Sequence, residues 1–203
     1  MNVGKIMSVR TPILAGLMGM TALGLCRAQK AVEFSSEAGV SGNFSGEVVY
    51  YGGLHGVLSK KNNCTDLYCG AIIDSDKRCT FESQLENEYS WNKHISSWIR
   101  ETFHLSKQET ALTSEIAPIK VNKSFKKFDA FVAPAYILAN DFRDGETWQC
   151  LGIVLNTMYN INSKNSIKFE AEYITDPAKN IFKTKFGSFK DNTSYVVSYI
   201  RNF

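Results

Sequence analysis

Residues 80–91, "TFESQLENEYSW", alternate apolar and polar side chains with a period of two. Phe81, Leu85 and Tyr89 share one face, and glutamates dominate the other. Because successive side chains of a strand point to opposite faces, this pattern indicates a strand with one apolar and one polar side. The same alternation recurs in "GVSGNFSGEVVYY" (39–51), "KKFDAFVAPAYIL" (126–138) and "SIKFEAEYI" (166–174).

The connections between such strands vary regularly in length. The predicted strands are 39–51, 80–91, 95–105, 110–119, 126–138, 147–159, 166–175 and 193–203. Short turns at 92–93, 121–124 and 160–166 alternate with links at 52–79, 106–109, 139–146 and 176–192. Short turns on one side and longer loops on the other are typical of outer-membrane barrels. The sequence therefore predicts an all-β fold, an eight-stranded antiparallel up-and-down transmembrane β-barrel with its long loops on one side.

The N-terminal 28 residues form a separate segment. Lys5 and Arg10 precede the apolar run 13–25, and residues 26–28 end on a small residue. This order is typical of a secretory signal peptide, and the apolar run is too short to span a bilayer. The alternative is an uncleaved membrane anchor. We expect a signal peptide at 1–28, a short periplasmic segment at 29–38 and the barrel domain at 39–203.

The predicted signal peptide, residues 1–28, accounts for the net positive charge of the chain. Lys5, Arg10 and Arg27 carry three positive charges, and the formal charge of the whole chain is +3. The rest of the chain is balanced, which does not support binding to nucleic acid.

The alternation in the final stretch "NTSYVVSYIRNF" (192–203) predicts a strand, and the stretch ends on an aromatic residue. With the hairpin "YNINSKNSIKFEAEYI" (159–174), it resembles the OmpA-type and OmpX-type family of small outer-membrane barrels. The resemblance covers residues 39–203 as a pattern. It implies that the last strand is an assembly signal for the barrel-assembly machinery, and that outer-membrane lipid surrounds the wall. The signal residues would be Tyr195, Val197, Tyr199 and Phe203. Arg201 departs from the family, which usually has an apolar or aromatic residue there.

The segment "HISSWIRETFHL" (94–105) allows two readings. As a strand, it must point either Arg100 or Glu101 at lipid, which is unfavourable for a charge near the bilayer midplane. The spacing of Ile95, Trp98, Ile99 and Phe103 also fits an amphipathic helix. A helix would invalidate the count of eight strands.

The polar faces of the predicted strands carry many charges. The expected barrel-interior charges are Glu47, Glu82, Glu86, Glu88, Glu115, Asp129, Lys127, Lys168, Glu170 and Glu172. An interior of eight strands is only wide enough for side chains to fill. The favoured reading is a polar plug of paired charges, because an unpaired buried charge is costly. The alternative is an ion pathway.

Catalysis finds little support in the sequence. His94 and Ser96 would share a strand face, in an arrangement that resembles the lipid A deacylase family. The predicted topology, however, places them at the periplasmic turn, away from the outer leaflet. His55 and His104 are isolated, and no metal-ligand spacing, nucleophile elbow or phosphate-binding loop is present. We expect neither an enzyme nor a cofactor.

The remaining cysteines after the leader are Cys64, Cys69, Cys79 and Cys150. An even number in an exported chain suggests disulfides, and four thiols allow three connectivities. The turn-prone "DSDK" within 69–79 could bring Cys69 and Cys79 together, which would leave Cys64 for Cys150. The predicted topology gathers all four cysteines on the outer side of the membrane. The alternative is that some of them are unpaired.

Three classes of function stay open, and the sequence favours the first, with the second as its main alternative. The first is a surface or structural protein of the outer membrane whose loops 52–79 and 176–192 bind an unidentified partner. The second is a small porin-like channel in the same fold. The third is a soluble, secreted, lipocalin-like carrier, whose apolar faces would point into the barrel.

Overall fold

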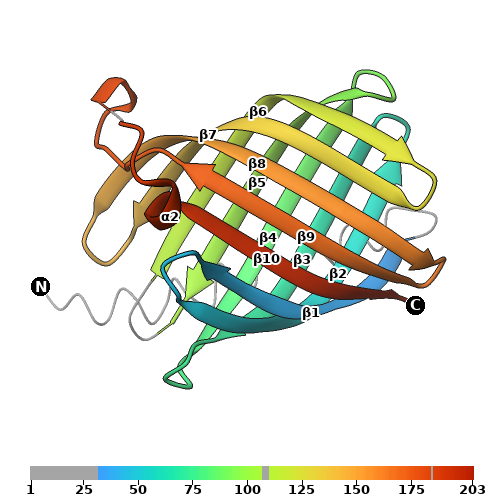
Figure 1. Cartoon of the computed structure of the whole chain (residues 1–203), viewed down its shortest axis with the longest axis horizontal. Coiled ribbons are helices and arrows are strands. Elements are labelled where there is room, and N and C mark those ends of the chain that lie inside the picture. Colours follow the sequence, from blue (N-terminus) through green and yellow to red (C-terminus); the bar gives the residue numbers. More distant parts are fainter. Residues whose placement is uncertain (1–31, 107–109, 184) are drawn as a thin grey trace, which may run out of the picture. The chain divides into compact units, whose positions relative to one another are not determined.

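The chain folds as a closed antiparallel β-barrel (Figure 1). The structure, a computed structural model, describes residues 32–106, 110–183 and 185–203. Its strands are β1 (Glu33–Asn43), β2 (Val48–Lys60), β3 (Asn63–Ile73), β4 (Cys79–Ser90), β5 (Ile95–Leu105), β6 (Thr110–Phe125), β7 (Phe128–Asp141), β8 (Glu146–Asn162), β9 (Asn165–Ile174) and β10 (Thr193–Asn202). Each strand pairs with the next, and β10 pairs with β1 to close the ring. The predicted all-β antiparallel barrel is confirmed, but ten strands replace the expected eight.

The two additional strands lie in the N-terminal third. The predicted strand 39–51 is divided by a turn at 44–47, where Gly46 has a φ of 108° and the Asn43 side chain accepts the Ser45 and Glu47 amides. The predicted loop 52–79 contains most of β2 and all of β3, joined by the two-residue turn at 61–62. The expected contact surface at 52–79 is therefore barrel wall.

The barrel also begins earlier than residue 39. Because β1 starts at Glu33 and pairs with β2 from that residue, most of the segment 29–38 is strand rather than a periplasmic extension. The predicted signal peptide lies outside the described residues. None of the helices in the described part of the chain is long and apolar enough to span a membrane.

The two ends of the barrel differ in their connections. The turns at 61–62, 91–94, 126–127 and 163–164 lie at the end that holds Glu33 and Asn202, which we call the termini end. The connections at 44–47, 74–78, 142–145 and 175–192 lie at the opposite end, where β5 also ends and β6 begins, and which we call the loop end. Only 175–192 is long, and it contains the 3-10 turn η1 (Ile181–Lys183) and the helical turn α2 (Phe189–Asn192).

Residues 95–105 form β5, so the helical alternative is wrong. The strand turns Arg100 into the barrel, where it is buried, and leaves Glu101 exposed on the outer wall. The neighbouring β6 accommodates Pro118 through a bulge, since its register with β7 shifts between Ile116 and Val121. A proline has no amide hydrogen for the ladder, which explains the interruption at this point.

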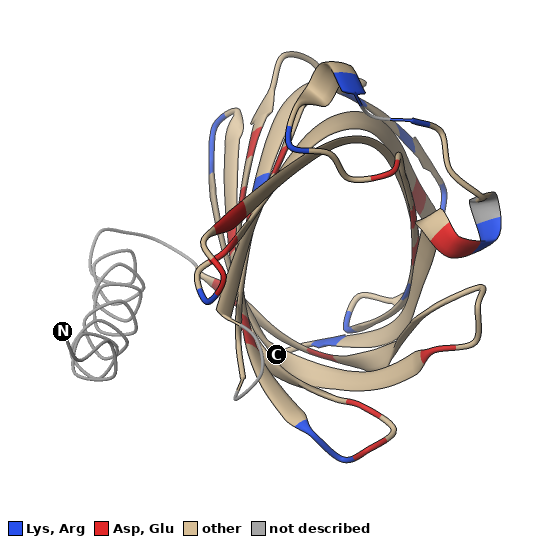
Figure 2. Cartoon of the chain, turned by 90° about the vertical axis from the view of Figure 1, so that its left-hand side faces the viewer, with Lys and Arg blue, Asp and Glu red and all other residues tan. Residues whose placement is uncertain are grey.

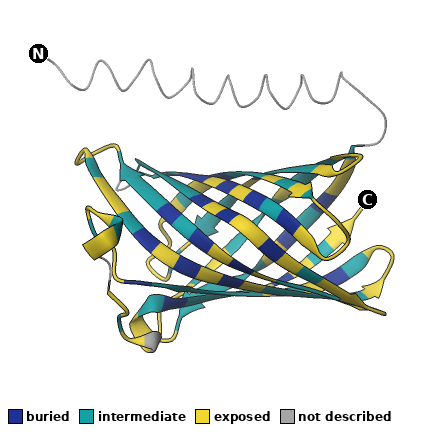
Figure 3. Cartoon of the chain, turned by 90° about the horizontal axis from the view of Figure 1, so that it is seen from above, coloured by how far each residue is buried: buried dark blue, intermediate teal, exposed yellow. Residues whose placement is uncertain are grey.

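Exposed and buried residues alternate along the strands (Figure 3). Many of the exposed residues are large and hydrophobic, so the outer wall is apolar. Its midsection carries Leu54, Ile99, Ile116, Val132, Ile153, Leu155, Phe169 and Val197. Exposed aromatic residues ring the termini end at Phe34, Tyr89, Trp91, Phe125, Phe128, Tyr159, Tyr199 and Phe203, and the loop end at Phe44, Tyr50, Phe81 and Phe142. The lipocalin-like alternative requires the reverse arrangement, with apolar faces inside, and is therefore wrong.

The four cysteines are free thiols, so the predicted disulfides are wrong. Cys69 pairs with Ser83 and Cys79 pairs with Ile73 on the β3–β4 ladder. Four residues of strand separate the two thiols, about 13 Å at the usual rise. A disulfide needs Cα atoms within about 7 Å. Cys64 lies at the termini end of β3, so the four thiols do not gather at one end.

We expect each of these cysteines to react with a maleimide when the refolded chain is denatured without reductant. Peptide mass mapping would show one adduct on each of the four, as in a reduced control. A disulfide-linked peptide pair containing Cys69 and Cys79 would contradict the register of β3 and β4.

Candidate functional site

The barrel encloses a cavity of about 610 Å³ that runs along its length. Near the termini end it is lined by Ser35 and Val57, and near the loop end by Ile72 and Ser194. The full lining includes residues from all ten strands, so the cavity lies in the lumen of the barrel. The interior of the barrel is therefore the candidate functional site.

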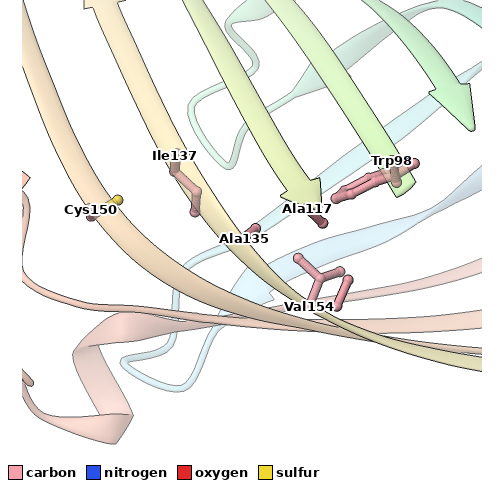
Figure 4. Close-up of a cluster of buried hydrophobic side chains, with 7 residues drawn as sticks. Trp98, Ala117, Ala135, Ile137, Cys150 and Val154 are labelled. Atoms are coloured by element: carbon pink, nitrogen blue, oxygen red, sulfur yellow. The ribbon is translucent and has the colours of Figure 1, made fainter. Parts of the chain in front are cut away.

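Part of the lumen beside β5–β8 is filled by side chains. Trp98, Ala117, Ala133, Ala135, Ile137, Cys150 and Val154 form a buried apolar cluster on β5–β8 (Figure 4). The small alanines of β6 and β7 leave room for the Trp98 indole, which is 1% exposed. This packing narrows the lumen beside these four strands.

Arg100 forms the boundary between the filled and open parts of the lumen. Its guanidinium donates to both carboxylate oxygens of Glu115, at 3.0 and 2.6 Å, and to Glu170 at 2.8 Å. Glu86 lies 3.8 Å away, and the Trp98 ring centroid lies 4.8 Å from the guanidinium carbon. Because β6, β7 and β8 separate β5 from β9 on this side of the ring, the Arg100–Glu170 pair spans the interior.

A second network surrounds Glu37 on β1. This carboxylate, 3% exposed, accepts hydrogen bonds from Tyr51 at 2.7 Å and Ser198 at 2.6 Å, and pairs with Lys168 at 2.6 Å. His55 Nε2 lies 2.7 Å from Glu37, and its Nδ1 lies 3.0 Å from Asp66. Both ring nitrogens face carboxylates, so both can donate only when His55 is the imidazolium ion. The network ties β1 to β2, β9 and β10.

Acidic side chains outnumber basic ones along the cavity. Its lining contains the carboxylates Glu37, Asp66, Glu82, Glu86, Glu115, Glu170 and Glu172, against Arg100, Lys168 and two histidines. His104 pairs with Glu82 at 2.8 Å. Glu172 has no hydrogen bond or ion pair with any described residue. Figure 2, which looks at the barrel from the loop end, shows acidic segments around the wall. The cavity therefore carries excess negative charge.

Two further cavities adjoin the first. One, of about 620 Å³, opens at the termini end and shares Phe131, Asn156 and Met158 with the long cavity. There Lys120 pairs with Glu88 at 2.6 Å and lies 4.0 Å from the Phe131 ring centroid. The other, of about 590 Å³, lies at the loop end and shares Thr113, Glu115 and Glu172. Together the three cavities extend from one mouth to the other.

The structure places most of the expected interior charges on the cavity walls. Glu82, Glu86, Glu88, Glu115, Asp129, Lys168, Glu170 and Glu172 line one or more of the three cavities. Two expectations are wrong: Glu47 lies exposed on the 44–47 turn, and Lys127 lies on the 126–127 turn, where it donates to the Ile161 carbonyl. The expected assembly residues Tyr195, Val197 and Tyr199 lie on β10, and Phe203 follows its end.

Several interior residues were missed from the sequence. Glu37, His55 and Asp66 lie on β1, β2 and β3, in a region where the sequence predicted only the single strand 39–51. Lys120 lies beyond the expected end of its strand at residue 119, because the Pro118 bulge extends β6 to Phe125. A basic residue two positions after a proline in a strand would have been the available signal.

The structure does not assemble the residues considered for catalysis. His94 lies exposed on the 91–94 turn, whereas Ser96 is fully buried and accepts a hydrogen bond from Asn122 at 2.8 Å. Within the described part of the chain, no group of three or more histidine, cysteine, aspartate or glutamate side chains has the geometry to hold a metal ion.

A closed antiparallel barrel with a charged interior and an apolar outer wall has the architecture of membrane-spanning β-barrels. No protein-family model matches the chain, and no curated protein matches its sequence.

Solved structures with a similar arrangement are outer-membrane proteins and porins. OmpT, an outer membrane protein of Vibrio cholerae, is 13% identical with a TM-score of 0.36, over 86% of this chain and 62% of OmpT. The KdgM porin in complex with disordered oligogalacturonate is 11% identical with a TM-score of 0.40, over 85% of this chain and 99% of KdgM. An anion-selective porin from Comamonas acidovorans is 12% identical with a TM-score of 0.33, over 76% of this chain and 49% of the porin. The chain thus spans about three fifths of OmpT. At these scores, the similarities carry no argument about function.

Proposed function

We propose that the chain is an integral protein of the bacterial outer membrane that forms a narrow, cation-selective channel. The membrane part of this proposal rests on the outer wall. Phe81 and Tyr89 of β4 belong to the aromatic bands at opposite ends of the barrel. Eight residues at the usual rise and tilt of a barrel strand span about 20 Å. This is close to the apolar band of outer-membrane barrels, about 25 Å tall.

The channel part rests on one observation: a chain of adjoining cavities runs from mouth to mouth and is lined by excess carboxylates. A narrow path lined by one sign of charge concentrates ions of the opposite sign. A plug of fully paired charges, the interpretation favoured by the sequence, would leave neither a cavity along the lumen nor an unpaired Glu172. The filled β5–β8 sector limits passage to small solutes.

Glu172 provides the sharpest test of charge selection. We expect Glu172→Gln, which keeps the side-chain shape and breaks no hydrogen bond with a described residue, to shift the reversal potential of the refolded barrel toward zero in a tenfold KCl gradient. A fully cation-selective pore would give about 59 mV under these conditions. The measurement is made at pH 9, so that the Glu172 carboxyl is ionised, and in planar bilayers of neutral lipid, so that lipid charge contributes nothing.

The matched control is Glu101→Gln, which removes the same charge from the outer wall. It should leave the reversal potential unchanged. Absence of conductance from fully folded barrel would overturn the channel and leave the surface-protein alternative. A reversal potential of anionic sign would overturn the proposed cation selectivity.

A further inference from the structure

The 18 residues 175–192 between β9 and β10, which we call the rim loop, are held at both legs. On the outgoing leg, the Thr175 amide donates to the Leu151 carbonyl, and Ala178 forms a bridge with Gln149 of β8. The two legs meet at the bridge between Asp176 and Lys185. The two legs of the loop therefore extend the wall.

The rim loop leans toward the outside of the barrel. The Tyr173 hydroxyl donates to the Gly187 carbonyl at 3.2 Å, and the Gln149 side chain donates to the Lys179 carbonyl at 3.3 Å. Both side chains belong to the outer wall, because their neighbours Glu172 and Cys150 face the cavities. In Figure 2, the short coil of α2 likewise lies outside the ring of strands. The loop thus stands beside the region that lipid would occupy.

The tip of the loop exposes two aromatic residues. Phe182 is 95% exposed and Phe186 is 85% exposed, the two highest values among the exposed large hydrophobic residues of the described chain. Neither ring packs against the barrel. Exposure of two neighbouring phenylalanines is unfavourable in water, but aromatic rings are favoured at the headgroup level of a membrane.

The same loop carries exposed lysines that form no ion pair with any described residue, namely Lys183, Lys185 and Lys190. The two acids of the loop are instead engaged: Asp176 accepts a hydrogen bond from Asn192, and Asp191 accepts one from Ser45. The accessible surface of the loop therefore combines aromatic rings with lysines.

We propose that the rim loop binds the phosphate-bearing headgroups of anionic lipids in the adjacent leaflet. Phe182 and Phe186 enter the headgroup region, and Lys183, Lys185 and Lys190 contact phosphate oxygens. Aromatic and basic side chains on one surface are the combination that binds anionic membrane surfaces. The inference rests on the membrane insertion in the proposed function, but not on conductance.

The test uses the full-length barrel in a neutral detergent, titrated with phosphatidylglycerol or phosphatidylcholine and measured by native mass spectrometry. We expect the wild-type barrel to bind phosphatidylglycerol at least fivefold more tightly than phosphatidylcholine. The triple variant Lys183→Gln, Lys185→Gln, Lys190→Gln should lose this preference. The double variant Phe182→Ser, Phe186→Ser should weaken binding of both lipids and keep their ratio.

The matched control is Lys60→Gln, Lys61→Gln, Lys93→Gln, which removes three positive charges from the termini end. It should retain the wild-type preference. The proposal is overturned if the rim-loop triple variant keeps the preference, or if glycerol phosphate without acyl chains competes as well as the lipid. It is also overturned if the two phenylalanines are required for a dimer instead. Cation selectivity in neutral bilayers is measured separately, so failure of this inference is distinguishable from failure of the channel.

Discussion

Replacement of Arg100 by alanine is expected to destabilise the folded barrel by about 3–5 kcal/mol. The reason is that Arg100 is 6% exposed and its guanidinium pairs with Glu115 and Glu170 at 2.6 and 2.8 Å. Without Arg100, these carboxylates and Glu86 would face one another in the interior. The measurement is the urea midpoint of the refolded barrel in detergent micelles, read from the mobility difference between unheated and boiled samples.

The matched control is Arg78→Ala on the 74–78 turn, where the guanidinium pairs with Asp74 and Asp76 on an exposed surface. Exposed ion pairs contribute about 0–1 kcal/mol, so this variant should unfold near the wild-type midpoint. The combination Arg100→Met, Glu115→Gln, Glu170→Gln should recover much of the lost stability, because it leaves fewer buried charges without a partner. An Arg100→Ala barrel as stable as wild type would contradict the central role of this cluster.

The same substitution has a consequence for transport. Arg100 is the boundary of the open lumen, and its loss removes both bulk and a positive charge. We therefore expect the Arg100→Ala barrel that does fold to conduct more and to prefer cations more strongly than wild type.

The sequence predicted the strands whose two faces differ most. Strands β4 and β9 alternate glutamates with aromatic or aliphatic residues, and their periodicity was sufficient to place them within about one residue. Strand β2 was missed beyond residue 51 because Gly52, Gly53 and Gly56 have no side chains and interrupt the alternation of apolar and polar residues. Its inward residues Tyr51, His55 and Val57 also do not read as a uniformly polar face.

The charged interior could be predicted only in part, because pairing depends on the closure of the ring. Glu170 and Arg100 lie 70 residues apart and meet only when β5 and β9 face each other across the lumen. A strand pattern also could not decide between Arg100 and Glu101 as the inward residue. The three carboxylates around the guanidinium favour Arg100 inside, and a lipid-facing glutamate is less costly than a lipid-facing arginine.

Replacement of Gly39 by alanine or valine is expected to prevent closure of the barrel between β1 and β10. Gly39 lies opposite Ser198 in this ladder. A Cβ atom at this position would collide with the Val197 carbonyl oxygen and lie 2.8 Å from the Ser198 Cα atom. These are backbone atoms of the partner strand, so no side-chain rotation relieves the contact. Destabilisation should reach about 3 kcal/mol or more, at or above the upper end for overpacking.

The control is Gly52→Val on the adjacent strand β2, where an added Cβ would meet its nearest atoms, the Glu37 carbonyl oxygen and the Ala38 Cβ, at 3.5 and 3.8 Å. These are ordinary contacts, and the new side chain would join the apolar outer wall, so we expect folding at the wild-type level. The measurement is the fraction of chain that shows the unheated mobility of folded barrel after refolding into micelles.

The collision at position 39 involves the Cβ atom itself, which alanine and valine both carry. We therefore expect alanine to be nearly as destabilising as valine at this position. A Gly39→Ala chain that folds as well as wild type would mean that β1 and β10 pair more loosely than the structure places them. In that case closure would depend on the Glu37 network, which ties the same two strands through Ser198.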